Sequence, residues 1–92
     1  MECTVELFGT LRQLMKTTEV KLRLSPGASL RDLVAALVQR EARLLEGVVD
    51  PKTLALSVPY RFYQEGKGFV DDLSQKVEHG ARLLLMSAAV GG

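Results

Sequence analysis

The feature of this 92-residue sequence that most limits its fold is one long amphipathic helical segment near the middle. Ser29 precedes the segment and Asp32 follows three residues later, a variant of the capping box that begins many helices. Apolar residues at helical spacing continue less regularly to Leu44 and Leu45, and Gly47 predicts the end of a helix of about 17 residues. The apolar residues at helical spacing are Leu30, Leu33, Val34, Leu37 and Val38.

Two segments before this helix alternate between apolar and polar residues. Residues 2–8 and 19–24 have the period of two that predicts strands with one buried face. Ser25, Pro26 and Gly27 supply turn chemistry after the second segment. We therefore expect two paired strands, and the alternation puts Phe8 on the polar side of the first.

The segments after the helix are shorter and less regular. Residues 54–58 alternate and predict a third strand, which Pro59 ends or confines to a sheet edge. Residues 60–63 are aromatic and β-prone but set no register. Phe69, Val70 and Leu73 are expected to return to the core, and residues 82–86 predict an apolar last strand.

The order of these elements predicts the fold class. Strand, strand, helix, strand, short strand, strand describes an α+β protein in which a mixed sheet of four to five strands packs on one long helix. That arrangement is the β-grasp, or ubiquitin-like, architecture. We expect a single domain over residues 1–92, with residues 87–92 as an extended C-terminal tail. A chain of this length buries about 60 to 65% of its unfolded surface, so it needs no metal or disulfide to fold.

Composition argues against several classes of partner. Twelve basic and 11 acidic residues give a net charge of +1, and aromatic residues make up 5%, so nucleic acid is not an expected partner. The longest apolar run, residues 83–90, is far shorter than the ~20 residues of a membrane span. Cys3 is the single cysteine, which suits a reducing compartment. Because no basic and apolar leader follows Met1, we expect a cytoplasmic protein.

Few side chains suggest chemistry of their own. His79 lies in a predicted turn without a second His or Cys nearby, so we expect an exposed histidine and no metal site. Asp71 and Asp72 are expected to be solvated, and Arg12 is interpreted as surface charge. No catalytic triad signature or phosphate-binding glycine loop is present.

The end of the sequence is more informative for function. An apolar run gives way to small residues and then to Gly91 and Gly92. Because glycine lacks a Cβ, such an end is thin, and it can enter a narrow tunnel and present its carboxylate to a partner. From Ser87 an extended arm reaches about 20 Å at ~3.3 Å per residue. A passive, frayed terminus is the alternative interpretation.

Three stretches of the sequence resemble one known family. They are VELFGTLRQLMK at residues 5–16, ASLRDLVAAL at residues 28–37 and HGARLLLMSAAVGG at residues 79–92. Together they resemble the MoaD/ThiS sulfur-carrier family, and most of all the small subunit of molybdopterin synthase. The Gly-Gly end is the most specific of these similarities.

The resemblance implies a function for the last three residues. In that family an enzyme of the ubiquitin-activating type uses ATP to convert the terminal carboxylate to an acyl-adenylate, which then becomes a thiocarboxylate. In molybdenum cofactor biosynthesis the sulfur then goes to a pterin precursor inside the large subunit of molybdopterin synthase. Carried onto this sequence, Gly92 holds the sulfur, and Gly91 and Val90 thread behind it. The protein would bind no cofactor and use no catalytic side chain, so its status as an enzyme stays open.

The strand pattern also predicts a surface for those partners. If Leu83 and Leu85 point inward, Leu84 and Met86 emerge on the same outer face as Phe8. The resemblance matches Phe8 and Met86 with positions that face the partner. The alternative is that one or more of them pack beneath a loop.

Other functions remain open at this point. The end of the chain would also serve in a ubiquitin-like modifier that is conjugated to lysines, or in a thiamine-type sulfur carrier. A β-grasp binding module with an inert tail is the third class. The sequence does not name the sulfur acceptor.

Overall fold

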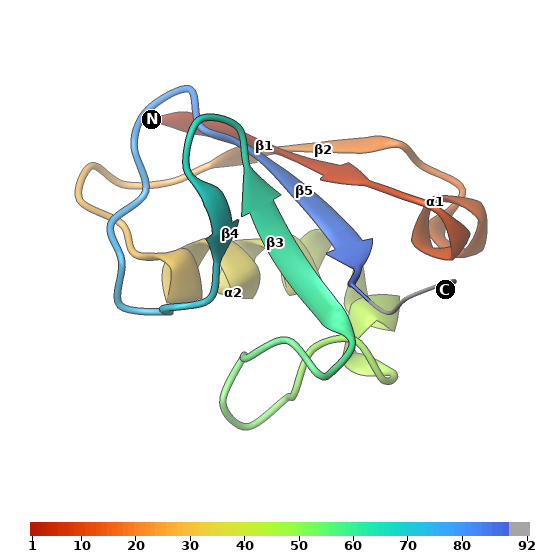
Figure 1. The fold of residues 1–92 in the computed structure, drawn as a ribbon. Helices are drawn as coiled ribbons and strands as arrows, with labels where there is room; N and C mark the ends of the chain where they lie inside the picture. Colours follow the sequence, from red (N-terminus) through yellow and green to blue (C-terminus); the bar gives the residue numbers. More distant parts are fainter. Residues whose placement is uncertain (89–92) are drawn as a thin grey trace.

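The computed structural model of this protein describes residues 1–88 and contains five strands, two α-helices and one short 3-10 helix (Figure 1). In chain order they are β1 (Glu2–Leu7), α1 (Thr10–Met15), β2 (Glu19–Arg23), α2 (Leu30–Arg40), η1 (Ala42–Leu45), β3 (Tyr60–Gln64), β4 (Gly68–Val70) and β5 (Arg82–Ser87).

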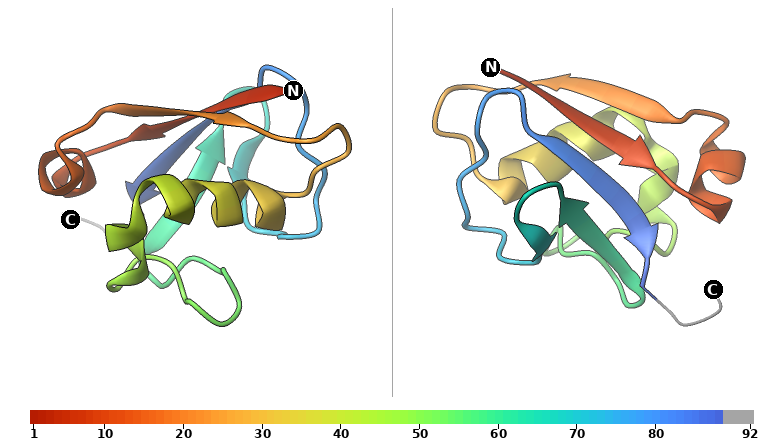
Figure 2. Two further views of the ribbon diagram at one scale, coloured as in Figure 1. Left: turned by 180° about the vertical axis from the view of Figure 1, so that it is seen from behind. Right: turned by 45° about the horizontal axis from the view of Figure 1, so that its top comes forward.

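The strands form one mixed sheet in the order β2-β1-β5-β3-β4. β1 and β5 pair in parallel at its centre, and the other neighbouring strands pair antiparallel. α2 crosses one face of the sheet, while no helix of residues 1–88 covers the opposite face (Figure 2). The expected β-grasp architecture is therefore confirmed, with five strands.

The core lies between α2 and the covered face of the sheet. Inward side chains of β1 and β5 meet the apolar stripe of α2, and Phe62 of β3 closes the layer at 1% exposure. The side chains with no exposed surface are Val5, Leu33, Val34, Leu37, Leu44 and Leu85. Strand alternation and helical spacing thus converge on one apolar cluster, as the sequence pattern predicts.

α2 begins as the sequence predicts but ends earlier. Ser29 Oγ accepts the N–H of Asp32 at 3.2 Å, and Asp32 Oδ2 accepts the N–H of Ser29 at 2.9 Å, which completes the capping box. The helix spans 11 residues, because Glu41 leaves the helical conformation at φ −131°, ψ 73°. η1 then carries Leu44 to the core, so the expected helix of about 17 residues is wrong.

Replacing Ser29 with alanine tests this cap. The variant loses the side-chain acceptor for the N–H of Asp32, so we expect the free energy of unfolding to fall by about 1 kcal/mol. Urea unfolding followed by circular dichroism measures the difference. Ser25→Ala is the matched control, since Ser25 is exposed and lies outside the helix. Equal losses in both variants would contradict a capping role.

The strand expected at residues 54–58 is absent, and this prediction is wrong. Leu54 has φ +65°, in the left-handed region, which interrupts an extended strand. Leu56 forms one isolated bridge to Val49, and Val58 is 94% exposed. The segment is a loop whose half-buried leucines pack against the core, and the third strand is β3, which starts after the cis Val58–Pro59 bond.

The end of the described chain remains attached to the sheet. Ser87 is the last residue of β5 and pairs with Tyr60, and the N–H of Ala88 donates to the carbonyl oxygen of Pro59 at 2.7 Å. The tail expected from residue 87 therefore does not begin there. Val90, Gly91 and Gly92 lie outside the described residues.

Among residues 1–88, no helix combines the length and the apolar character needed to cross a membrane.

Candidate functional site: an apolar patch on the uncovered sheet face

The uncovered face of the sheet carries the three side chains predicted to contact a partner. Leu83 and Leu85 point into the core, which leaves Leu84 and Met86 half-buried on the other face. The N–H of Phe8 donates to the carbonyl oxygen of Leu85 at 3.1 Å, so β1 and β5 stay in register up to this point. Phe8 is 39% exposed. The structure places all three on one face, and their role in binding stays a prediction.

Two aromatic residues that the sequence did not assign to this surface join it. Tyr63 of β3 lies opposite Leu84 in the ladder and opposite Phe69 of β4. The Tyr63 and Phe69 rings meet edge to face, with centroids 5.4 Å apart and an interplanar angle of 82°. We call Phe8, Tyr63, Phe69, Leu84 and Met86 the outer apolar patch.

Phe69 was expected in the core but is 45% exposed, whereas Val70 beside it is buried. The reason is the β3–β4 hairpin, whose register places Phe62 opposite Val70 and so fixes both inward. Their neighbours must then point outward. The sequence contains a signal for the outward position of Phe69, namely an inward Phe62 followed by a short glycine-containing loop. Interpreting this signal requires the register of the hairpin.

An ion pair borders the patch on β3. Arg61 contacts the Asp71 carboxylate with two bonds, Nη2 to Oδ2 at 2.6 Å and Nε to Oδ1 at 3.2 Å. The guanidinium also lies over the Phe69 ring, 4.1 Å from its centroid. Asp71 was expected to be solvated; it is exposed, and it also orients Arg61 against the patch. Asp72 is also bonded, to the Ser74 hydroxyl at 2.6 Å.

A second charged cluster borders the patch on the side of β1 and β2. Arg82 Nη2 lies 2.7 Å from Glu19 Oε2 and 3.5 Å from Glu6 Oε2. The hydrogen bond to Glu19, with the charge of both carboxylates, holds the pKa of Arg82 above its ordinary value. The apolar patch therefore has polar borders on two sides, an arrangement typical of a protein-binding surface.

The contact between Arg61 and Asp71 makes a testable prediction. The hydrogen bond from Arg61 lowers the pKa of Asp71 below its ordinary value of 3.8. A carboxyl group whose pKa is lower in the folded state than in the unfolded state stabilises the fold at pH values above its unfolded-state pKa. This contribution is lost as the pH falls through its folded-state pKa. In an NMR titration we expect the Asp71 carboxyl carbon to titrate below 3.8 and Arg61→Gln to raise the midpoint. Lys52→Gln is the control; an unchanged midpoint in Arg61→Gln would refute the prediction.

A groove continues from the patch past the end of β5. One recess of about 260 Å³ is lined by Phe8, Met86 and Ser87 together with Tyr60. A second recess of about 360 Å³ shares Tyr60 with it and extends to Leu14 of α1, which is 52% exposed. The groove therefore runs beside the end of β5.

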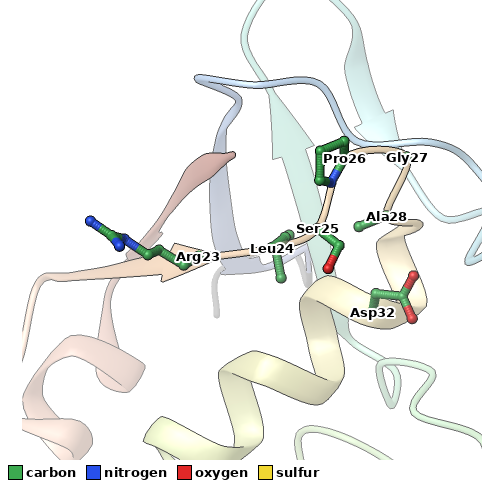
Figure 3. Close-up of a pocket in the computed structure, with 7 residues that line it drawn as sticks. All are labelled: Arg23, Leu24, Ser25, Pro26, Gly27, Ala28 and Asp32. Carbon is green, nitrogen blue, oxygen red and sulfur yellow. The ribbon is translucent and has the colours of Figure 1, made fainter.

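Other candidate groups do not form a site. A hollow of about 420 Å³ lies at the turn between β2 and α2, but its charged side chains, Arg23 and Asp32, point apart (Figure 3). His79 is exposed, and its Nδ1 accepts the N–H of Glu2 at 3.1 Å. Cys3 is 1% exposed, and burial raises the pKa of its thiol. Within residues 1–88, no three His, Cys, Asp or Glu side chains are grouped to hold a metal ion.

No protein-family model and no curated protein sequence matches this chain. Solved structures do match it over nearly its whole length. SAMP1 from Haloferax volcanii superposes with a TM-score of 0.84 at 21% identity, covering 100% of both chains. A putative molybdopterin converting factor, subunit 1, from Pyrococcus furiosus has a TM-score of 0.77 at 20% identity, covering 97% of this chain and 99% of its own.

The chain has the β-grasp fold. A third β-grasp match comes from the BexX/CysO complex of Amycolatopsis orientalis, with a TM-score of 0.67 at 21% identity, covering 98% of this chain and 99% of the matched chain. At these identities the likeness establishes the fold. The MoaD/ThiS resemblance of the sequence and the β-grasp neighbours therefore agree at the level of architecture.

Proposed function

We propose that this β-grasp protein is a ubiquitin-like sulfur carrier that works through the carboxylate of Gly92. The observation that carries the proposal is the position of the outer apolar patch on β5, the strand that leads into Gly91 and Gly92. Four residues separate Ala88 from this carboxylate, a reach of about 13 Å at ~3.3 Å per residue. A partner that binds the patch would thus have the end of the chain close to its own active site.

The chemistry requires no catalytic side chain on the carrier. A carboxylate is a poor electrophile, so a partner enzyme first activates it: a carboxylate oxygen attacks the α-phosphate of ATP, and pyrophosphate leaves. A sulfur nucleophile then attacks the acyl carbon and AMP leaves, which places sulfur on Gly92. The described part of the carrier contributes a rigid body and an apolar surface, which suit recognition and delivery.

The finer assignment is to molybdopterin synthase. The sequence resemblance supports it, and so does the likeness to a putative molybdopterin converting factor subunit from Pyrococcus furiosus. In this role the protein would be the small, cytoplasmic subunit, and its partners would be the large synthase subunit and an adenylating enzyme. The CysO neighbour, solved in complex with BexX, supports a partnered mode of action more generally.

Intact mass spectrometry tests the proposal directly. The purified chain is incubated with an adenylating enzyme from its host, ATP and a sulfur donor. We expect a mass increase equal to the exchange of one oxygen for sulfur, located in the C-terminal peptide. No mass change with an active adenylating enzyme would reject sulfur carriage.

A protein modifier is the second candidate. The observation in its favour is the superposition on SAMP1, a small archaeal modifier protein, with full coverage of both chains. In this case Gly92 would form an amide with a lysine of a target protein. Cell extracts would then contain higher-mass adducts that disappear when Gly92 is deleted, which sulfur carriage alone does not produce.

A further inference from the structure

β2 is an edge strand, and within the described residues no other strand pairs with its outer side (Figure 2). Met1 and Leu24 exchange backbone hydrogen bonds at 2.7 and 2.8 Å, and the N–H of Leu7 donates to the carbonyl oxygen of Thr18. In an antiparallel pair such bonded positions recur every second residue. The even-numbered residues of β2 therefore bond to β1, and the backbone groups of Glu19, Lys21 and Arg23 point to the open edge.

The protein's own side chains occupy two of the outward carbonyl groups of this edge, those of Glu19 and Lys21, but none of its outward N–H groups. Arg40 Nη1 donates to the carbonyl oxygen of Lys21 at 3.1 Å, and Thr17 Oγ1 donates to that of Glu19 at 3.3 Å. Across residues 1–88, the outward N–H groups of Glu19, Lys21 and Arg23 have no acceptor. The edge thus presents three backbone donors, each two residues apart.

The side chains along this edge are also positive and lack acidic partners. Lys21 and Arg23 are exposed and form no ion pair with any residue in the described part of the chain. Arg40 is bound to a carbonyl group, which leaves its charge uncompensated. Glu19, the acidic residue of β2, is held by Arg82 at 2.7 Å.

Neighbouring carboxylates do not neutralise the edge. Glu2 lies opposite Arg23 in the ladder but is not within ion-pair distance. Asp32, beyond the end of β2, points away from Arg23 (Figure 3) and accepts bonds from Ser29. The open donors and the free cations therefore coincide along one strand.

We propose that the β2 edge, residues 19–23 with Arg40, binds an extended acidic segment of a partner protein. Backbone carbonyl groups of the segment accept from the N–H groups of Glu19, Lys21 and Arg23, and its carboxylates lie beside Lys21 and Arg23. The donors lie two residues apart, which is the spacing of the carbonyl groups along one side of an extended polypeptide strand. No aromatic side chain lies on β2 to stack a base, which favours protein over nucleic acid. This inference is independent of sulfur carriage.

A designed peptide of alternating glutamate and valine provides the probe. The ¹⁵N-labelled full chain is titrated with it at low salt, and amide hydrogen exchange is measured by NMR. We expect exchange to slow at Glu19, Lys21 and Arg23 and to stay unchanged at Val20 and Leu22, which already bond to β1. Raising the salt concentration weakens the binding.

Two charge reversals separate a specific edge from a general charge effect. Lys21→Glu weakens peptide binding about tenfold, because a favourable contact becomes a repulsive one. Lys52→Glu makes the same charge change at an exposed residue of the 50–59 loop and leaves the binding within about twofold. Thermal unfolding checks that both variants stay folded.

Three results would overturn the proposal. One is peptide binding without the alternating protection along β2, which would indicate diffuse attraction. Another is an equal loss of binding in Lys21→Glu and Lys52→Glu. The third is displacement of the peptide by a uridine oligonucleotide that protects the same amides more strongly, which would assign the edge to nucleic acid.

Discussion

Deletion of Gly92 should reduce sulfur loading at least about 100-fold. The variant still ends in a glycine carboxylate, but its arm is shorter by ~3.3 Å. A misplacement of even ~1 Å costs about 100-fold when a reacting group must meet a fixed active site. The measurement is the initial rate of thiocarboxylate formation by intact mass, with the adenylating enzyme in excess.

The control is the stability of the same variant. The core and all hydrogen bonds described above lie within residues 1–88, so we expect an unchanged unfolding transition. Appending one alanine after Gly92 should abolish loading as well, because the carboxylate then belongs to another residue. Loading of the deletion variant at the parent rate would show that Gly92 is not the reacting residue.

Truncation of the outer apolar patch is expected to have the next largest effect. Phe8→Ala and Met86→Ala each remove an apolar side chain from the patch beside the end of β5. Buried aromatic and apolar anchors contribute about 2 kcal/mol each to an interface, so each variant should bind the adenylating enzyme about 30-fold more weakly. Isothermal titration calorimetry with that enzyme measures the change.

Leu45→Ala is the matched control for Met86→Ala. Leu45 is also half-buried and apolar, but it belongs to η1 in the helix layer, away from the uncovered sheet face. We expect it to lower the stability of the protein without changing partner affinity. If Leu45→Ala weakens binding as much as Met86→Ala does, the loss reflects general destabilisation and the patch is not the interface.

The parts of the fold that the sequence predicted are those in which local pattern and tertiary packing agree. Strict alternation in residues 2–8 and 19–24 identified two strands and the face that each buries. The capping box at Ser29 located the start of α2 to the residue. In these segments one periodicity satisfies both the backbone and the core.

The errors arose where backbone geometry overrides the pattern. Leu54 and Leu56 alternate as strand residues do, yet the positive φ of Leu54 makes the segment a loop. Glu41 is a good helix former, but the chain turns there to bring Leu44 into the core. Neither conformation has a strong signature in the residue types, because tertiary packing selects them.

The candidate site was predicted in part for a related reason. Phe8, Leu84 and Met86 followed from alternation within single strands, which the sequence records directly. Tyr63 and Phe69 depend on the pairing of β3 with β4 and β5, which strand alternation alone does not specify. The Arg61 contact with Phe69 and Asp71 depends on the same pairing.

The central position of β5 has a consequence for biosynthesis. β5 lies between β1 and β3, so the two halves of the sheet become joined when the last segment emerges from the ribosome. A product terminated before Arg82 leaves two unconnected hairpins with exposed edges, which favour aggregation and proteolysis. Cells would therefore accumulate few folded copies of chains that end before β5, because the sheet cannot be completed without this strand.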